Sequence, residues 1–173
     1  IARRQRQMCI ETDGGGLNEQ KKVFDTVKEG EVIVIEARQE SGSGTLGDIL
    51  ALRAKVRGAA GVVTDGGVRD YEAVKEIGLP VFTQGAHPCV LGRKHVPWDS
   101  DIAVSCGNAT VVPGDIIVGD DDGVVVIPRD IAADVAESAL AKEHEDEWVA
   151  SQVETGASLD GLFPPTGCLL YTS

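Results

Sequence analysis

The sequence is poor in aromatic and in basic residues. Phe, Trp and Tyr together make up only 4% of the 173 residues, so a folded core must be largely aliphatic. The 16 Lys and Arg residues are outnumbered by 28 Asp and Glu residues, which gives a net charge of −12. Because affinity for nucleic acid depends on basic side chains that neutralise phosphates, this balance argues against a nucleic-acid partner.

Long apolar runs and paired cysteines are also missing from the sequence. No run approaches the roughly 20 apolar residues of a membrane helix, so we expect no membrane span and a cytoplasmic location. The glycine run Gly14–Gly16 lacks the spacing of a nucleotide-binding loop. The cysteines stand far apart with no Cys-x-x-Cys pair, which excludes a zinc knuckle and favours reduced, mostly buried thiols at Cys9, Cys89, Cys106 and Cys168.

The length and the 42% apolar content fit one domain. We expect a single domain over residues 1–166 that lacks its N-terminal elements, because the chain starts at Ile1 and shows no sustained apolar period before Gly16. The segment 167–173 follows Pro164-Pro165 and matches no earlier pattern, so we interpret it as a non-native tail.

The first half of the chain alternates helix and strand patterns. Helices are expected over 18–29, 47–57 and 70–77, and strands over 31–37, 61–64 and 79–83. The second helix carries Ile49, Leu52 and Val56 on one face, and the third turns Tyr71, Val74 and Ile77 inward.

The second half is rich in short strands, expected over 102–105, 109–112, 116–118 and 124–127. The acidic segment Gly119–Gly123 lies between two of them and is interpreted as a hairpin turn rather than a cation site. A long charged helix follows over 130–154, with Glu143, Glu145 and Glu147 on a solvated face. The fold class is therefore α/β, with a mixed sheet that has an antiparallel portion.

The spacing between Asp48 and the pair Arg69-Asp70 predicts that these residues lie together. A helix of about ten residues spans ~15 Å, and the strand that follows it covers a similar length in the opposite direction. Arg69 and Asp70 should therefore lie near Gly47 and Asp48, at the carboxyl end of a strand, where open α/β sheets bind ligands.

These residue types suit a small anionic substrate and a hard metal ion. Helix N-termini favour a carboxylate, Gly47 admits a ligand to the backbone, and Arg69 offers a planar charged fork. Asp48 and Asp70 offer the oxygen ligands that Mg²⁺ or Mn²⁺ prefers. Each acid alone is more often a helix cap, and a single Arg is more often a surface ion pair, so the functional interpretation depends on their joint placement.

Four segments then resemble one known family: GDIL at 47–50, RGAAGVVTDGGVRD at 57–70, GLPVF at 78–82 and PGDIIVGDDDGVVVIP at 113–128. The chain from about Glu29 to Thr166 resembles the regulator of ribonuclease activity A-like family. That family includes 4-hydroxy-4-methyl-2-oxoglutarate and 4-carboxy-4-hydroxy-2-oxoadipate aldolases. The resemblance implies a swivelling α/β domain of αββαβ type, assembled as homotrimers or hexamers with sites between subunits.

The resemblance also implies roles for the clustered residues. Backbone amides of Gly47, Asp48, Ile49 and Leu50 would bind the carboxylate of pyruvate. Arg69 would bind the keto oxygen and stabilise the enolate. Asp70 would hold the divalent metal, Mg²⁺ or Mn²⁺, and Asp48 would reach a metal-bound water. A further acid would come from a neighbouring subunit, and no residue is assigned to it.

We therefore expect a metal-dependent lyase that cleaves 4-hydroxy-2-oxo diacids by a retro-aldol reaction or decarboxylates oxaloacetate to pyruvate. A Schiff-base route is disfavoured because Lys55 fits a solvated helix face. The alternatives are a non-catalytic regulator that binds a ribonuclease, and an enzyme that acts on another 2-oxo acid. His87-Pro88-Cys89 could line the pocket, although a structural role is favoured for it.

Overall fold

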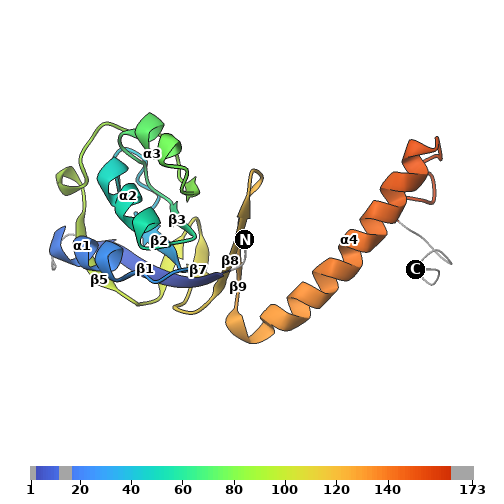
Figure 1. Cartoon of the computed structure of the whole chain (residues 1–173), viewed down its shortest axis with the longest axis horizontal. Helices are drawn as coiled ribbons and strands as arrows, with labels where there is room; N and C mark the ends of the chain where they lie inside the picture. The colour runs from blue at the N-terminus through green and yellow to red at the C-terminus, as the bar shows by residue number, and fades with distance from the viewer. Residues whose placement is uncertain (1–2, 12–16, 165–173) are drawn as a thin grey trace. The chain divides into compact units, whose positions relative to one another are not determined.

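The computed structural model describes residues 3–11 and 17–164 (Figure 1). It divides into two compact units, one that ends at Arg129 and one that begins at Asp130. The expected tail 167–173 and the run Gly14–Gly16 lie outside the described residues. In chain order, the elements of the first unit are β1 (Arg3–Glu11), α1 (Leu17–Thr26), β2 (Val32–Glu36), α2 (Asp48–Val56), β3 (Gly61–Thr64), α3 (Tyr71–Ile77), β4 (Val81–Phe82), η1 (Leu91–Arg93), β5 (Val96–Ser100), β6 (Val104–Cys106), β7 (Ala109–Val111), β8 (Ile116–Asp120) and β9 (Gly123–Ile127).

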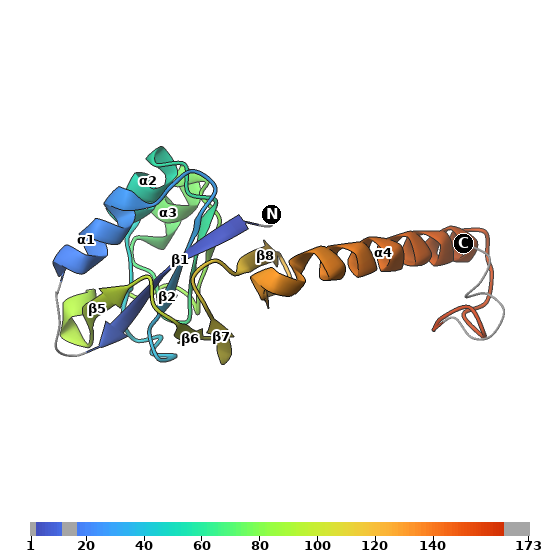
Figure 2. The same cartoon turned by 90° about the horizontal axis from the view of Figure 1, so that it is seen from below.

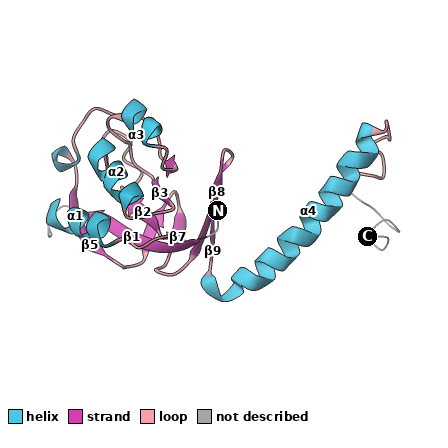
Figure 3. Cartoon of the chain, in the orientation of Figure 1, coloured by secondary structure: helices cyan, strands magenta, loops and turns pink. Residues whose placement is uncertain are grey.

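A mixed sheet organises the first unit. Its strands follow the order β4-β3-β2-β1-β8-β9, and β5 also pairs with β1. Strands β1 to β4 run parallel, whereas β5, β8 and β9 are antiparallel to their partners. The hairpin β6-β7 forms a separate two-stranded sheet. Figure 3 shows helices α1, α2 and α3 gathered on the same side of these strands. The predicted α/β class with an antiparallel portion is confirmed.

Strand β2 lies between two hydrophobic clusters because its side chains alternate in direction. Ile33 and Ile35 belong to the cluster that includes Phe24, Ala51 and Val74 from the three helices. Val32 and Val34 belong to a second cluster with residues of β6, β7 and β8. A strand that is buried on both faces reads as a continuous apolar run, which is why residues 31–37 were recognisable in the sequence.

Strand β1 lies in the segment before Gly16, where the sequence shows no sustained apolar period and no strand was predicted. Residues Arg3–Glu11 form a nine-residue strand that pairs with β2 on one side and with β8 and β5 on the other. Its sequence, RRQRQMCIE, begins with polar residues and has no β-branched run. The pattern typical of a strand was therefore absent, although the backbone supplies hydrogen bonds along both edges.

Most of the other expected elements are present with boundaries shifted by a few residues, whereas β5 was not predicted. In α3, Val74 is buried, and Tyr71 and Ile77 pack against the core as expected. In α2 the apolar face faces outward instead. Ile49, Leu52 and Val56 are 71%, 48% and 69% exposed, and the small residues Ala51 and Ala54 are buried in their place.

The second unit consists of the one-turn helix η2 (Arg129–Ile131), which begins at the boundary, the long helix α4 (Ala132–Glu154) and the segment after it, seen in Figure 2. Glu143 and Glu147 are exposed, as expected for a solvated face. Lys142 pairs with Glu145 at 3.2 Å and Asp146 at 3.0 Å, and these hydrogen bonds raise the pKa of Lys142. None of the helices in the described residues is long and apolar enough to cross a membrane.

Candidate active site

Two loops meet where the neighbouring parallel strands β2 and β3 end. The Thr45 amide donates to the Gly67 carbonyl at 2.7 Å, and the Gly67 amide donates to the Ser43 carbonyl at 3.1 Å. The Arg69 amide donates to the Leu46 carbonyl at 2.9 Å. These backbone hydrogen bonds bring residues 65–70 beside residues 43–47, as the spacing in the sequence predicted. The site lies at the carboxyl ends of the strands.

Buried polar side chains hold this junction in place. The Thr45 hydroxyl lies 3.0 Å from the Gly67 carbonyl and 3.2 Å from the Thr64 hydroxyl. The side-chain amide of Gln20, buried on α1, donates to the Thr45 carbonyl at 2.6 Å. Sequence reasoning missed Gln20 and Thr45. The only available signal for Gln20 was its place one turn before the core residues Val23 and Phe24.

Glycine leaves room at two positions where Arg69 and Asp70 lie against the backbone. A Cβ on Gly44 would lie 2.2 Å from the Arg69 Cγ. A Cβ on Gly47 would lie 2.8 Å from the Asp70 Oδ2 and 3.2 Å from the Arg69 Nη2. The Arg69 Nη2 and the Asp70 Oδ2 are 3.5 Å apart. The guanidinium and the carboxylate therefore meet over Gly47, at the start of α2.

Asp70 does not act as the helix cap that a lone aspartate at this position would suggest. It precedes α3, but its side chain makes no capping hydrogen bond. Its backbone is left-handed, with φ of +54°, a conformation that costs a non-glycine residue energy and concentrates at functional sites. The Asp70 side chain is 47% exposed, and its carboxylate lies toward Gly47 and Arg69 instead.

Asp48 is the first residue of α2 and is half-buried. Its Oδ1 accepts a hydrogen bond from the Ile49 amide at 2.8 Å, so one of the amides expected to bind a substrate carboxylate already has a partner. Gly47, at the cap position of α2, has no side chain with which to close the helix end. The helix N-terminus therefore stays open toward Arg69.

Arg69 lines two separate hollows. One, of about 310 Å³, is lined by residues of α1, of η1 and of the segment Gly44–Gly47, together with Leu50 and Arg69. The other, of about 330 Å³, is lined by Val68, Arg69, Asp70, Ala86, His87 and Pro88. Asp48 is not among the described residues that line either hollow. Of the residues expected to bind substrate, Gly47, Leu50 and Arg69 line the first hollow, whereas the Ile49 side chain is exposed.

The carboxylates of this region suit a divalent ion that keeps most of its water ligands better than an ion that is coordinated entirely by protein side chains. Among the described residues, no group of three or more His, Cys, Asp or Glu side chains could hold a metal. Mg²⁺ commonly keeps several waters and takes only one or two protein carboxylates. Asp70, exposed and free of a capping role, meets that requirement, and Asp48 follows Gly47 as the first residue of α2.

Two further candidates have structural explanations. Lys55 is exposed and donates a hydrogen bond to the Ile77 carbonyl, at the opposite end of α2 from Gly47. The acidic segment Gly119–Gly123 is the β8-β9 turn, where the Asp120 Oδ1 accepts the amides of Asp122 and Gly123 at 2.9 and 3.3 Å. The hairpin interpretation is confirmed.

Asp65 is a buried acid directly after strand β3. Its carboxylate accepts hydrogen bonds from the amides of Ala37 at 2.5 Å and Gln39 at 3.1 Å. Arg38 and Gln39 have left-handed backbones, with φ of 52° and 60°. Asp65 thus stabilises the strained turn after β2, which leads into the loop of the site.

The comparisons with known proteins decide the family. The family described as RraA-like, Aldolase/RraA, matches residues 8–126, which is more than half of the chain. The chain belongs to this family. A protein of Halalkalibacterium halodurans named "Putative 4-hydroxy-4-methyl-2-oxoglutarate aldolase" is 38% identical over 118 residues, covering 68% of this chain and 56% of that protein. The chain spans about half the length of the curated relatives it matches.

Solved structures agree with the RraA-like assignment. RraAS2 of Streptomyces coelicolor, described as an unusual member of the RNase ES inhibitor RraA protein family, is 31% identical with a TM-score of 0.81. The match covers 88% of this chain and 78% of that one. An uncharacterized protein from Pseudomonas syringae has a TM-score of 0.87 at 23% identity, covering 96% and 76% of the two chains, and supports the fold alone. The predicted family and fold are confirmed.

Proposed function

We propose that this protein is a divalent-metal-dependent lyase that releases pyruvate from 4-hydroxy-4-methyl-2-oxoglutarate or a similar 4-hydroxy-2-oxo diacid, or from oxaloacetate. The observation that carries the proposal is the meeting of the Arg69 guanidinium and the Asp70 carboxylate over Gly47. Family membership and the aldolase name of a 38% identical relative support an aldolase-type activity.

The 2-oxo acid end of the substrate would lie in the first hollow, between Leu50 and Arg69. The open N-terminus of α2 favours its carboxylate, because unpaired helix amides and the helix dipole attract an anion. Arg69 would donate to the keto oxygen through its planar fork. Because Gly47 has no side chain, the substrate can approach the backbone closely.

The residues fit a bound Mg²⁺ or Mn²⁺ with Asp70 as its protein ligand and Asp48 within the same region. When bound, such an ion polarises a keto oxygen and lowers the pKa of a coordinated water. The identity of the metal is part of the proposal. Its test is the loss of activity after treatment with EDTA and its return with Mg²⁺ or Mn²⁺.

Arg69 would stabilise the charge that develops during bond cleavage. In the retro-aldol reaction the C4 hydroxyl loses its proton to water, and C4 becomes a keto carbon as the C3–C4 bond breaks. The electron pair of that bond forms an enolate, which takes up a proton at C3 to give pyruvate. In oxaloacetate the bond to the C4 carboxylate breaks, and carbon dioxide leaves the same enolate. A permanently charged guanidinium aimed at the enolate oxygen lowers the barrier in both reactions. No lysine is among the described residues that line the two hollows, which disfavours a Schiff base.

Pyruvate release from both substrates tests the proposal. The unaltered chain with Mg²⁺ should be active, and Arg69→Ala should lower kcat about 10²- to 10³-fold, as expected for loss of one electrostatic donor. Asp70→Ala should lose the activation by Mg²⁺, because it removes the proposed metal ligand. The control is Arg53→Ala, since Arg53 lies on α2 but pairs with Asp25 at 2.7 Å on the exposed surface. Equal rates in all four proteins would rule out the assigned site.

A second candidate function is protein binding without catalysis. It is favoured by the 31% identity to RraAS2, a member of an RNase inhibitor family. The discriminating measurement is the rate of RNA cleavage by an RNase E-type enzyme with and without this protein. Inhibition that survives Asp48→Ala and Arg69→Ala, with no pyruvate release from any 2-oxo acid, would favour the regulator over the lyase.

A further inference from the structure

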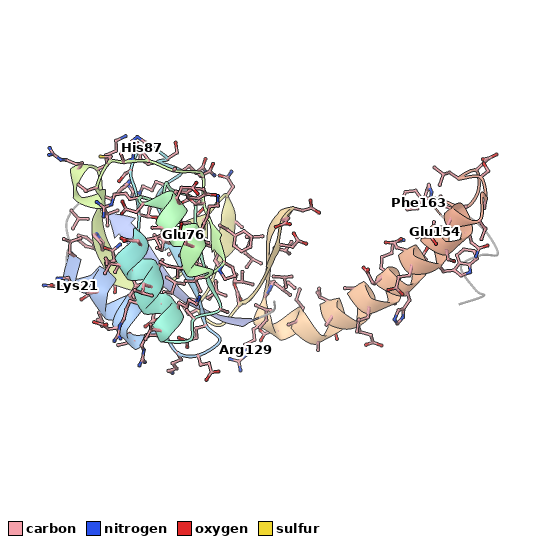
Figure 4. The ribbon with its side chains drawn as sticks, turned by 45° about the horizontal axis from the view of Figure 1, so that its top comes forward. Lys21, Glu76, His87, Arg129, Glu154 and Phe163 are labelled. Carbon is pink, nitrogen blue, oxygen red and sulfur yellow. The ribbon has the colours of Figure 1, made fainter. Side chains whose placement is uncertain are left out.

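The second hollow contains a histidine whose position is fixed by the backbone. The His87 amide donates to the Val68 carbonyl at 2.9 Å, and the Val68 amide donates to the Gly85 carbonyl at 2.9 Å. These bonds tie the loop after β4, on which Figure 4 labels His87, to the loop that carries Arg69 and Asp70. A Cβ on Gly67 would lie 3.1 Å from the His87 Cβ, so the imidazole begins directly beside the site.

The hydrogen bonding of the His87 ring determines which nitrogen faces a ligand as a donor. The Cys89 amide donates to His87 Nδ1 at 3.1 Å, so Nδ1 is an acceptor and the proton of the neutral ring is on Nε2. No described residue is recorded as accepting a hydrogen bond from Nε2. His87 is half-buried and lines the hollow with Arg69 and Asp70. The ring therefore presents an N–H group to the hollow.

The other residues that line the hollow indicate which ligand group the His87 Nε2–H would bind. Val68, Ala86 and Pro88 are apolar, and the Asp70 carboxylate is paired with Arg69 at 3.5 Å. Because Arg69 is assigned to the keto oxygen, His87 is the donor in this lining that remains to orient a second acceptor group of a ligand. A carboxylate is the acceptor that gains most from a hydrogen bond, because charge roughly doubles its strength.

We propose that His87 Nε2 binds the distal carboxylate of a dicarboxylic 2-oxo acid whose keto end lies on the other side of Arg69. The inference rests on the proposed function, and it selects the substrate class: diacids in preference to 2-oxo acids that end in a methyl group. His87 is a specificity-determining residue in this account. It takes no part in breaking the carbon–carbon bond.

Equilibrium binding tests the inference without requiring turnover. Calorimetric titration with Mg²⁺ present compares 2-oxoglutarate with 2-oxopentanoate, which has the same chain length but a methyl group in place of the C5 carboxylate. The unaltered protein should bind 2-oxoglutarate on the order of tenfold more tightly, the effect of one hydrogen bond to a charged group. His87→Ala should bind the two acids equally, with its affinity for 2-oxopentanoate unchanged.

Two variants separate ligand binding from support of the loop. His87→Asn keeps an acceptor near the Cys89 amide but loses the distant donor, so it should lose the preference for the diacid. His87→Gln extends a donor amide toward the hollow and should retain part of that preference. A preference that persists in both His87→Ala and His87→Asn, or its absence from the unaltered protein, would overturn the inference. The proposed lyase activity is judged separately, by pyruvate release, so the two failures are distinguishable.

Discussion

At the scale of single residues, Gly47 decides whether Arg69 and Asp70 can meet at the start of α2. Its backbone, with φ of −137° and ψ of −171°, is one that any residue adopts, so the glycine contributes space and not an unusual conformation. Gly47→Ala would place a methyl group 2.8 Å from the Asp70 Oδ2. The flexible ends of both side chains would have to move.

Gly47→Ala should therefore lower the rate of pyruvate release about 10²-fold, because a displacement of about 1 Å in a catalytic group has effects of that size. Its free energy of unfolding should stay within about 1 kcal/mol of the unaltered protein or rise slightly, since alanine reduces the entropy of the unfolded chain. Steady-state kinetics and urea unfolding check the two parts. Unchanged kinetics would contradict the close approach at Gly47.

His95 should make the fold sensitive to acid. The residue is 9% exposed, and its Nε2 is buried with no hydrogen-bond partner among the residues that the structure describes. Burial lowers the pKa of His95, partly opposed by the nearby Glu40 carboxylate. The unfolded chain then binds the proton more readily, so this contribution to stability is complete above about pH 6.5, the ordinary value, and is lost as the pH falls through the lower folded pKa.

His95→Phe should remove that acid sensitivity. As the pH falls below about 6.5, the unfolding free energy of the variant should rise relative to that of the unaltered protein, by at most about 1.4 kcal/mol per pH unit. Urea unfolding at several pH values from 7.5 to 5 measures it. Because the carboxylates titrate in both proteins, a difference that stays constant with pH would contradict the assignment.

The sequence predicted correctly which residues of the site lie together, because the lengths of the helix and of the strand after it determine that proximity. A helix followed by a returning strand must bring Arg69 and Asp70 near Gly47, and the observed contacts confirm it. Gln20, Thr45 and Asp65 were missed as supports of the loops. Their roles depend on hydrogen bonds to backbone groups 22 to 28 residues away in the chain, which leave no pattern in a single sequence.

At the scale of elements, α2 has an exposed apolar face formed by Ile49, Leu52 and Val56. The pattern correctly predicted that these residues share a face, but not that the face points outward. A face of this kind, next to the start of α2 where the candidate site lies, is typical of an interface. We propose that a second copy of this chain covers it, in line with the expected homo-oligomer.

Leu52→Glu should then weaken self-association about 10²-fold, because burial of a leucine contributes roughly 1.5–3 kcal/mol. Sedimentation velocity over a range of protein concentrations measures the change. Lys21→Glu, on the exposed surface of α1, is a control that adds the same side chain elsewhere. A monomeric unaltered protein, or a variant with unchanged association, would contradict this role for α2.

Strand β1 shows the limit of prediction by residue pattern. The runs of β2 and β3 are apolar because both faces of these strands are covered, and they were predicted. Strand β1 has a polar sequence, yet it pairs with β2, β5 and β8. Its conformation follows from backbone hydrogen bonding to neighbours that are distant in sequence, so periodicity could not identify it.

At the scale of the whole molecule, family membership and fold are established, whereas the activity is proposed. The matched residues 8–126 contain the loops 43–47 and 65–70 and the residues that line both hollows. The chain spans about half the length of its curated relatives, so activity must be measured on this chain itself.

The most direct test of the central claim is the rate of pyruvate release from 4-hydroxy-4-methyl-2-oxoglutarate, measured after treatment with EDTA and again after addition of Mg²⁺. The account predicts that Mg²⁺ restores activity in the unaltered chain and fails to restore it in Asp70→Asn, a change that keeps the side-chain shape and removes the charge. Equal activity of the two proteins with Mg²⁺, or activity in the unaltered chain that EDTA leaves intact, would contradict it.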